Sequence, residues 1–78
     1  MGDEQRIAEI VSGIGKTGAL QPEQDIFDAG LSSIQALELL TELEAVFEVS
    51  LPDEGFVKAR TVRALHDLIS AARNGSQP

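Results

Sequence analysis

The spacing of hydrophobic residues along the chain predicts helices. Near the N-terminus, hydrophobic residues recur at the i, i+3, i+4 and i+7 positions that share one face of a helix. They are Ile7, Ile10, Val11 and Ile14. Gly13, Gly15 and Gly18 follow, and we expect these glycines to end the helix as a C-cap and a flexible connector. No alternation of hydrophobic and polar residues is long enough to indicate a strand.

The second predicted helix has the clearest start and end signals. Ser32 followed by Gln35 forms an S-x-x-Q capping box ahead of a hydrophobic run. Leu51-Pro52 interrupts the chain after this run, because the residue before a proline avoids the α region. We therefore expect a helix from about Ser33 to Phe47. Its core-facing residues are expected to be Ile34, Leu37, Leu40, Leu43, Val46 and Phe47, widened by Ala36 and Leu39.

The remaining hydrophobic residues predict one short and one longer helix. Asp53 is expected to cap a short turn that carries Phe56 and Val57, and Thr61 is expected to cap the last helix. The core-facing residues of the last helix are expected to be Val62, Leu65, Leu68, Ile69 and Ala72. In the long loop between the first two helices, residues 26–27 are hydrophobic and are expected to reach the core.

These segments predict an all-α fold, a bundle of three main helices and one short helix around a single core. With 78 residues, the chain is expected to form one domain over residues 1–73. Residues 74–78 have linker composition and are expected to form a disordered tail. A chain of this length buries only about 60% of the surface that it exposes when unfolded, which leaves little room for a deep catalytic cleft.

The net charge of the chain indicates which classes of partner it could bind. It has 13 acidic against 6 basic residues, a net charge of −7, and no Lys or Arg lies between Lys16 and Lys58. Such a charge disfavours nucleic acid as a partner. The acidic stretch is either a solvated face or a docking surface for basic partners. The absence of cysteine, of a membrane-length apolar run and of a signal peptide favours a cytoplasmic protein that does not interact with membranes. We expect it to be a monomer.

Three motifs suggest a binding or catalytic site but lack residues that such a site requires. In GIGKTG (13–18), the first glycine of a phosphate-binding loop would fall at Ile10, and the segment ends a helix instead of opening one. In DIFDAG (25–30), the side chains at the third and fifth positions of a calcium loop would lack oxygen ligands. His66 is alone and is expected at the boundary of the last helix. We therefore expect no metal site and no catalytic apparatus.

The serine pair at the start of the second helix is different. Ser32 is expected to be occupied by the capping box, whereas Ser33 has no such role. Ser33 lies where the unpaired N–H groups and the positive end of the helix dipole favour a phosphate. Ala29 and Gly30 leave space beside it. Ser33 is therefore an accessible hydroxyl suited to carrying a phosphodiester, unless both serines only begin the helix.

The segment DAGLSSIQALELL (28–40) resembles the modification site of acyl carrier proteins. The resemblance continues through LTELEAVFEVSLPDE (40–54) and KARTVRALHDLI (58–69), and so covers nearly the whole chain. It implies a four-helix carrier with 4′-phosphopantetheine attached to Ser33 by a phosphopantetheinyl transferase. The arm would hold an acyl group as a thioester. It also implies docking on the second helix, where Glu38 and Glu44 fall at positions that are often acidic in the family. Glu42 shares a helix face with Glu38, and we expect it and Ile34 to be further contacts.

The resemblance also implies further partners: a ligase or acyltransferase that loads acyl or aminoacyl groups, and condensing or modifying enzymes. Ser32 replaces the family's usual Asp before the modified serine, and Gln35 replaces a frequent acid, so the rim of the site is less negative than in carriers of primary fatty acid synthesis. We therefore favour a freestanding carrier for polyketide or other specialised acyl assembly. An aminoacyl or peptidyl carrier of a nonribosomal-peptide-like pathway is the alternative, and an unmodified helical interaction domain is a second one.

Overall fold

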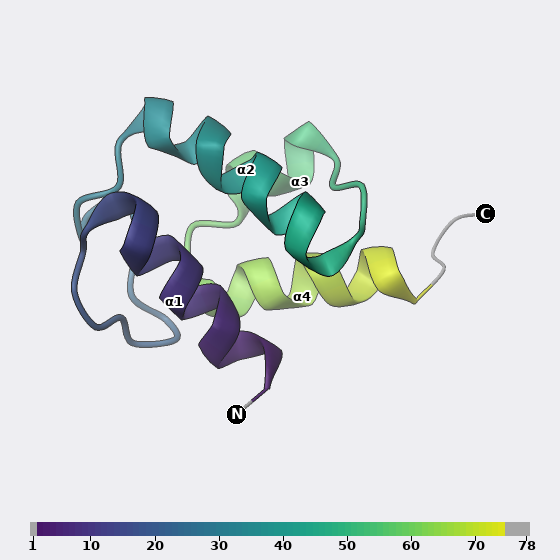
Figure 1. Cartoon of the computed structure of the whole chain (residues 1–78), viewed down its shortest axis with the longest axis horizontal. Coiled ribbons are helices and arrows are strands. Elements are labelled where there is room, and N and C mark those ends of the chain that lie inside the picture. The colour runs from purple at the N-terminus through teal and green to yellow at the C-terminus, as the bar shows by residue number, and fades with distance from the viewer. Residues whose placement is uncertain (1, 75–78) are drawn as a thin grey trace.

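The computed structural model describes residues 2–74, in which four helices and no strand occur. They are α1 (Asp3–Gly15), α2 (Ser33–Phe47), α3 (Asp53–Lys58) and α4 (Val62–Arg73). The predicted all-α fold with three main helices and one short helix is confirmed. Helix α1 packs against both α2 and α4, and α3 packs against α4 (Figure 1). Residues 75–78 of the predicted tail lie outside the described residues.

A small hydrophobic core lies between the helices. All four helices contribute to it, and so does the long loop between α1 and α2, because Ile26 is only 1% exposed and Phe27 packs against the core at half burial. The prediction for this loop is thus confirmed. The fully buried side chains are Ile7, Val11, Ile26, Leu39, Leu43, Val62, Leu65 and Ile69.

The end of α1 differs from the prediction that glycines would cap it. Gly13 and Gly15 lie inside the helix, and the left-handed C-cap residue is Lys16, with φ 53°. Gly15 is needed for packing instead. A Cβ atom at Gly15 would lie 2.8 Å from Leu31 Cδ1. The missing side chain therefore allows the end of α1 to approach the loop that leads into α2.

The buried face of α2 also differs from the prediction. The helix presents Ala36, Leu39 and Leu43 to the core, whereas Ile34 is 80% and Leu37 is 68% exposed. The prediction that Ile34 and Leu37 face the core is wrong. Hydrophobic residues surround much of α2, so the spacing alone does not select one face. Packing against α1 makes the selection.

The two helix starts near the C-terminus have different outcomes. Thr61 caps α4 as predicted, because its Oγ1 accepts a hydrogen bond from the backbone N–H of Ala64 at 3.0 Å. Asp53 is the first residue of α3 and not its cap, which is Pro52, so that prediction is wrong. Phe56 is buried in α3, while Val57 is 68% exposed.

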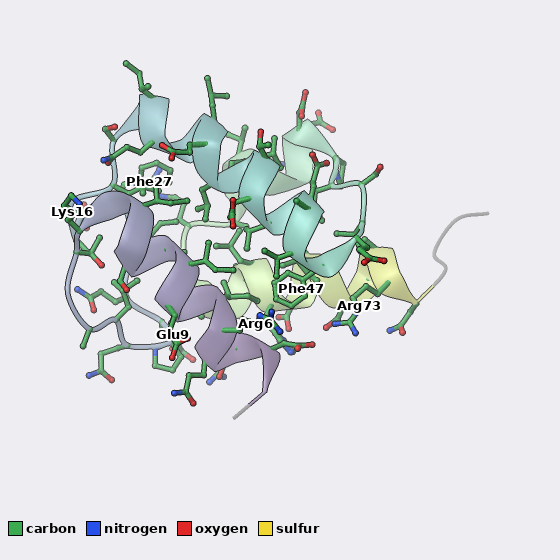
Figure 2. All side chains as sticks on the ribbon, viewed as in Figure 1. Arg6, Glu9, Lys16, Phe27, Phe47 and Arg73 are labelled. Carbon is green, nitrogen blue, oxygen red and sulfur yellow. The ribbon has the colours of Figure 1, made fainter. Side chains whose placement is uncertain are left out.

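The two ends of the described chain are joined by Arg73. Its Nη1 donates to Asp3 Oδ2 at 2.7 Å, and its guanidinium carbon lies 5.8 Å from the centroid of the Phe47 ring. Figure 2 shows Arg73 beside Phe47, where α4 passes the C-terminal end of α2. The contact links α1, α2 and α4 at the end of the molecule opposite Ser33.

Candidate functional site

The two serines at the start of α2 have different environments. Ser32 Oγ accepts a hydrogen bond from the backbone N–H of Gln35 at 3.1 Å, and Gln35 Oε1 accepts one from the backbone N–H of Ser32 at 3.0 Å. The predicted capping box is therefore confirmed. Ser33 is exposed, and among residues 2–74 its hydroxyl has no hydrogen-bond partner. Of the two hydroxyls, that of Ser33 is the one free for chemistry.

The loop before α2 fixes the position of Ser33. Gly30 has φ 132°, a conformation that side chains rarely adopt. The next residue, Leu31, is 3% exposed, and its backbone N–H donates to the carbonyl of Ile26 at 3.1 Å. The buried Leu31 therefore anchors the chain two residues before Ser33.

Gln35 holds the same turn from the other side. Its Nε2 donates to the backbone carbonyl of Ile14, near the end of α1, at 3.1 Å. The Gln35 side chain thus joins the last turn of α1 to the first turn of α2. This contact was not predicted, and a capping-box pattern alone does not reveal it.

The first turn of α2 is suited to a negatively charged group. The N–H groups at a helix start lack partners within the helix, and the helix dipole is positive there. The first turn of α2 contains no acidic residue. Together with the free hydroxyl of Ser33, this favours a phosphate attached at that position.

A cleft of about 590 Å³ opens beside Ser33, between the first half of α2 and α3. Its lining is mostly apolar, and Leu37 and Val57 belong to it although both are largely exposed. The cleft can therefore receive an apolar chain that starts at Ser33. The lining residues are Phe27, Leu31, Ser32, Ser33, Ala36, Leu37, Phe56, Val57 and Arg60.

Arg60 adds a positive charge to this cleft. Its Nε donates to Asp25 Oδ2 at 2.8 Å, and its guanidinium carbon lies 4.7 Å from the centroid of the Phe27 ring. Phe27 lies near the N-terminal end of α2 in Figure 2. The hydrogen bond from Arg60, followed by backbone N–H donors, lowers the pKa of Asp25 below its ordinary value of 3.8. Sequence reasoning missed this pair, because its members are far apart in the chain.

The predicted partner contacts fall into two groups. Ile34, Glu38 and Glu42 are exposed and lie four residues apart, so they share one face of α2, which begins at the residue after Ser33. Glu44 is half-buried, and its Oε2 accepts a hydrogen bond from the backbone N–H of Leu51 at 2.8 Å. The structure therefore gives Glu44 a role in holding the loop between α2 and α3.

The described part of the chain offers little for other chemistry. No group of three or more His, Cys, Asp or Glu side chains within residues 2–74 could hold a metal ion. His66 is half-buried, with Nδ1 3.5 Å from Asp67 Oδ1. Over the same residues, every helix is too short or too polar to cross a membrane.

Comparison with known sequences reveals a matching family and, among the relatives, a segment of a polyketide synthase. The family described as "Phosphopantetheine attachment site" matches residues 5–69. A non-reducing polyketide synthase, pkiA, from Emericella nidulans is 36% identical over 68 residues, which are 87% of this chain and 2% of the synthase. The chain thus spans a very small part of that relative.

Comparison with solved structures reveals the same fold. BlmI, a type-II acyl carrier protein from Streptomyces verticillus involved in bleomycin biosynthesis, superposes with a TM-score of 0.78 at 25% identity, over 87% of this chain and 82% of BlmI. The docking-domain complex PaxA T1-CDD/PaxB NDD of the Pax NRPS superposes with a TM-score of 0.86 at 20% identity, over 100% of this chain and 76% of that one. At 20% identity, the second likeness shows the fold alone.

Proposed function

Since this chain belongs to the phosphopantetheine attachment site family of non-catalytic carriers, which hold 4′-phosphopantetheine covalently, we propose that Ser33 is its attachment residue. In this role the chain holds an acyl group and presents it to partner enzymes in the cytoplasm. The observation that carries the proposal is the free hydroxyl of Ser33 at the start of α2, beside a capping box that occupies Ser32.

The residues around Ser33 fit the group. The hydroxyl is exposed, the first turn of α2 offers N–H donors to a phosphodiester, and an apolar cleft begins at the same place. When bound, the arm supplies a thiol that forms a thioester with the cargo. The chain itself supplies the attachment oxygen, the positive helix end and the cleft wall, while the chemistry on the cargo belongs to the partners.

We propose polyketide or other specialised acyl assembly as the pathway. The similarity to a segment of a polyketide synthase supports this choice, and so does the likeness to BlmI, an acyl carrier protein. A primary fatty acid pathway is less consistent with the site, because Ser32 and Gln35 leave its rim without an acidic side chain. The proposed partners are a phosphopantetheinyl transferase, a loading ligase or acyltransferase, and condensing or modifying enzymes.

The attachment residue is tested by intact mass after incubation with a promiscuous phosphopantetheinyl transferase and coenzyme A. The wild type should gain one phosphopantetheine group, and Ser33→Ala should gain none while keeping its helical circular dichroism spectrum. Ser32→Ala is the matched control. It should lose about 1 kcal/mol of unfolding free energy with the cap and still gain the group. Modification of Ser33→Ala, or an unmodified wild type, would contradict the proposal.

The cargo class is tested separately on the modified carrier. Mass spectrometry of protein purified from its native host identifies the attached group directly, and loading assays compare acyl with aminoacyl donors. An acyl thioester is the expected result. An aminoacyl thioester would instead assign the chain to nonribosomal-peptide-like assembly and leave the attachment at Ser33 intact.

A further inference from the structure

Arg60 is the one cation in the wall of the cleft beside Ser33. Among the described residues that line the cleft, the others are apolar or carry hydroxyl groups, and none is acidic. The chain has a net charge of −7, and no other described residue that lines the cleft is basic. In apolar binding sites, a small number of polar groups usually set the orientation and specificity of the ligand.

The guanidinium of Arg60 is held in place from two sides. Its Nε and Nη2 donate to the carboxylate of Asp25 at 2.8 and 3.4 Å, and its planar group lies over the ring of Phe27. The backbone carbonyl of Arg60 also accepts from the N–H of Ile26 at 2.8 Å. An arginine fixed in this way loses less side-chain entropy when it binds a further group.

The guanidinium still has donors to offer. It carries five N–H donors, and within residues 2–74 its only acceptor is Asp25. Planar N–H donors of arginine match the oxygens of phosphate and carboxylate groups. The Arg60 side chain is 52% exposed, so a ligand can reach it.

We propose that Arg60 binds a negatively charged oxygen group that belongs to the arm on Ser33 or to its cargo, within the cleft. The inference rests on the proposed function of Ser33. The charged group is either the phosphodiester of the arm or a carboxylate on the acyl chain. The rival interpretation is that Arg60 only joins the loop at Asp25 to the segment before α4.

Four forms of the protein distinguish these interpretations: apo, holo, butyryl-loaded and succinyl-loaded. A transferase prepares the last three from coenzyme A, butyryl-coenzyme A and succinyl-coenzyme A. Butyryl and succinyl chains are similar in length, and only succinyl ends in a carboxylate. If Arg60 binds a cargo carboxylate, the melting temperature of the succinyl form should exceed that of the butyryl form by about 4 °C at low ionic strength.

Variants then assign the effect to the side chain. Arg60→Gln should abolish the difference between succinyl and butyryl forms, and Arg60→Lys should keep part of it. Asp25→Asn is the matched control, because it removes the ion pair but retains the Arg60 cation in the cleft. It should keep a difference of the same sign, reduced in size because Arg60 is then held less firmly. Arg63→Gln removes a cation that pairs with Glu4 and Glu23 outside the cleft and should preserve the difference.

The phosphodiester is tested by the change in melting temperature from apo to holo. If it is the bound group, Arg60→Gln should make this change less favourable than it is in the wild type and in Asp25→Asn. The proposal is overturned if Arg60→Gln changes neither the difference between the succinyl and butyryl forms nor the change from apo to holo. It is also overturned if the wild type has equal melting temperatures with both cargos and Arg60→Gln shows the same apo-to-holo change as the wild type. A failure of the proposed function shows itself earlier, as a missing mass gain on Ser33.

Discussion

At the scale of single residues, Gln35 has two roles that no other side chain in the first turn of α2 could combine. Its Oε1 closes the capping box at Ser32, and its Nε2 donates to the carbonyl of Ile14. A glutamate at this position could still accept from Ser32, but at neutral pH it could not donate to Ile14. The amide therefore joins α1 to the turn that carries Ser33.

Gln35→Glu should lower the unfolding free energy by about 1 kcal/mol, because one hydrogen bond is lost. The new charge adds little to the balance: it lies near the positive end of the α2 dipole and also near the negative end of the α1 dipole, and these effects oppose each other. Urea unfolding at pH 7 measures the change. Gln35→Ala, which removes both bonds, should be less stable still.

Gln24→Glu is the control for this prediction. Gln24 is exposed, and its Oε1 accepts from the backbone N–H of Gln21, so a glutamate keeps the bond and adds the same charge. Its unfolding free energy should stay within about 0.5 kcal/mol of wild type. Equal stability of Gln35→Glu and wild type would show that the contact with Ile14 contributes nothing.

At the scale of elements, α2 has two different faces. Ala36, Leu39 and Leu43 pack into the core, whereas Ile34, Glu38 and Glu42 form an exposed stripe that begins beside Ser33. None of the described cations forms an ion pair with Glu38 or Glu42. A partner that lies along α2 with its active site at Ser33 would contact the apolar side chain of Ile34 next to Ser33 and two unpaired carboxylates further along the helix.

Glu38→Lys combined with Glu42→Lys should slow modification of Ser33 by the transferase at low salt, because basic residues on the partner would then be repelled. Exposed pairs contribute only ~0–1 kcal/mol each, so the effect should appear mainly in the association rate and should fade as salt is added. The measurement is the rate of mass gain against ionic strength, with circular dichroism as the folding control.

The matched control is Glu9→Lys combined with Asp67→Lys. It makes the same change in net charge at exposed positions of α1 and α4, away from the stripe on α2. Its rate should stay closer to the wild-type rate. If both double variants slow modification equally, net charge alone steers the transferase. If neither does, the stripe is a solvated face.

At the scale of the whole molecule, the charges are divided between paired and unpaired regions. Arg60, Arg63 and Arg73 pair with acidic residues of α1 and of the loop after it. On α2, its C-cap residue and α3, by contrast, five exposed acids have no ion-pair partner within residues 2–74. They are Glu38, Glu42, Glu48, Asp53 and Glu54.

The melting temperature should therefore rise with ionic strength. Folding brings these like charges together, and salt screens their repulsion over a Debye length of about 10 Å at 0.1 M. The arginine pairs are weakened as well, but each is about half exposed and contributes little. Thermal unfolding between low salt and about 0.5 M sodium chloride measures the balance, because the Debye length shortens as salt is added. A falling melting temperature would show that the arginine pairs dominate.

The sequence by itself determined the features that depend on near neighbours in the chain. The capping box at Ser32, the bounds of α2 and the cap at Thr61 each arise from contacts within about four residues, so their pattern is visible in the letters. The same local contacts show that the hydroxyl of Ser32 is engaged in the cap and that the hydroxyl of Ser33 is not. The failures at Asp53 and at the end of α1 lie in short-range features too, where proline and lysine occupy cap positions that other residues usually take.

Only the tertiary structure decided which face of α2 is buried and what surrounds Ser33. Hydrophobic residues cover so much of α2 that several faces could enter the core, and packing on α1 exposes Ile34 and Leu37. Asp25 and Arg60 are 35 residues apart in the chain, and the cleft combines residues of α2 and α3 with residues of the segments that precede α2 and α4. Such contacts leave no periodic trace in a single sequence, because they form only when the folded helices bring distant residues together.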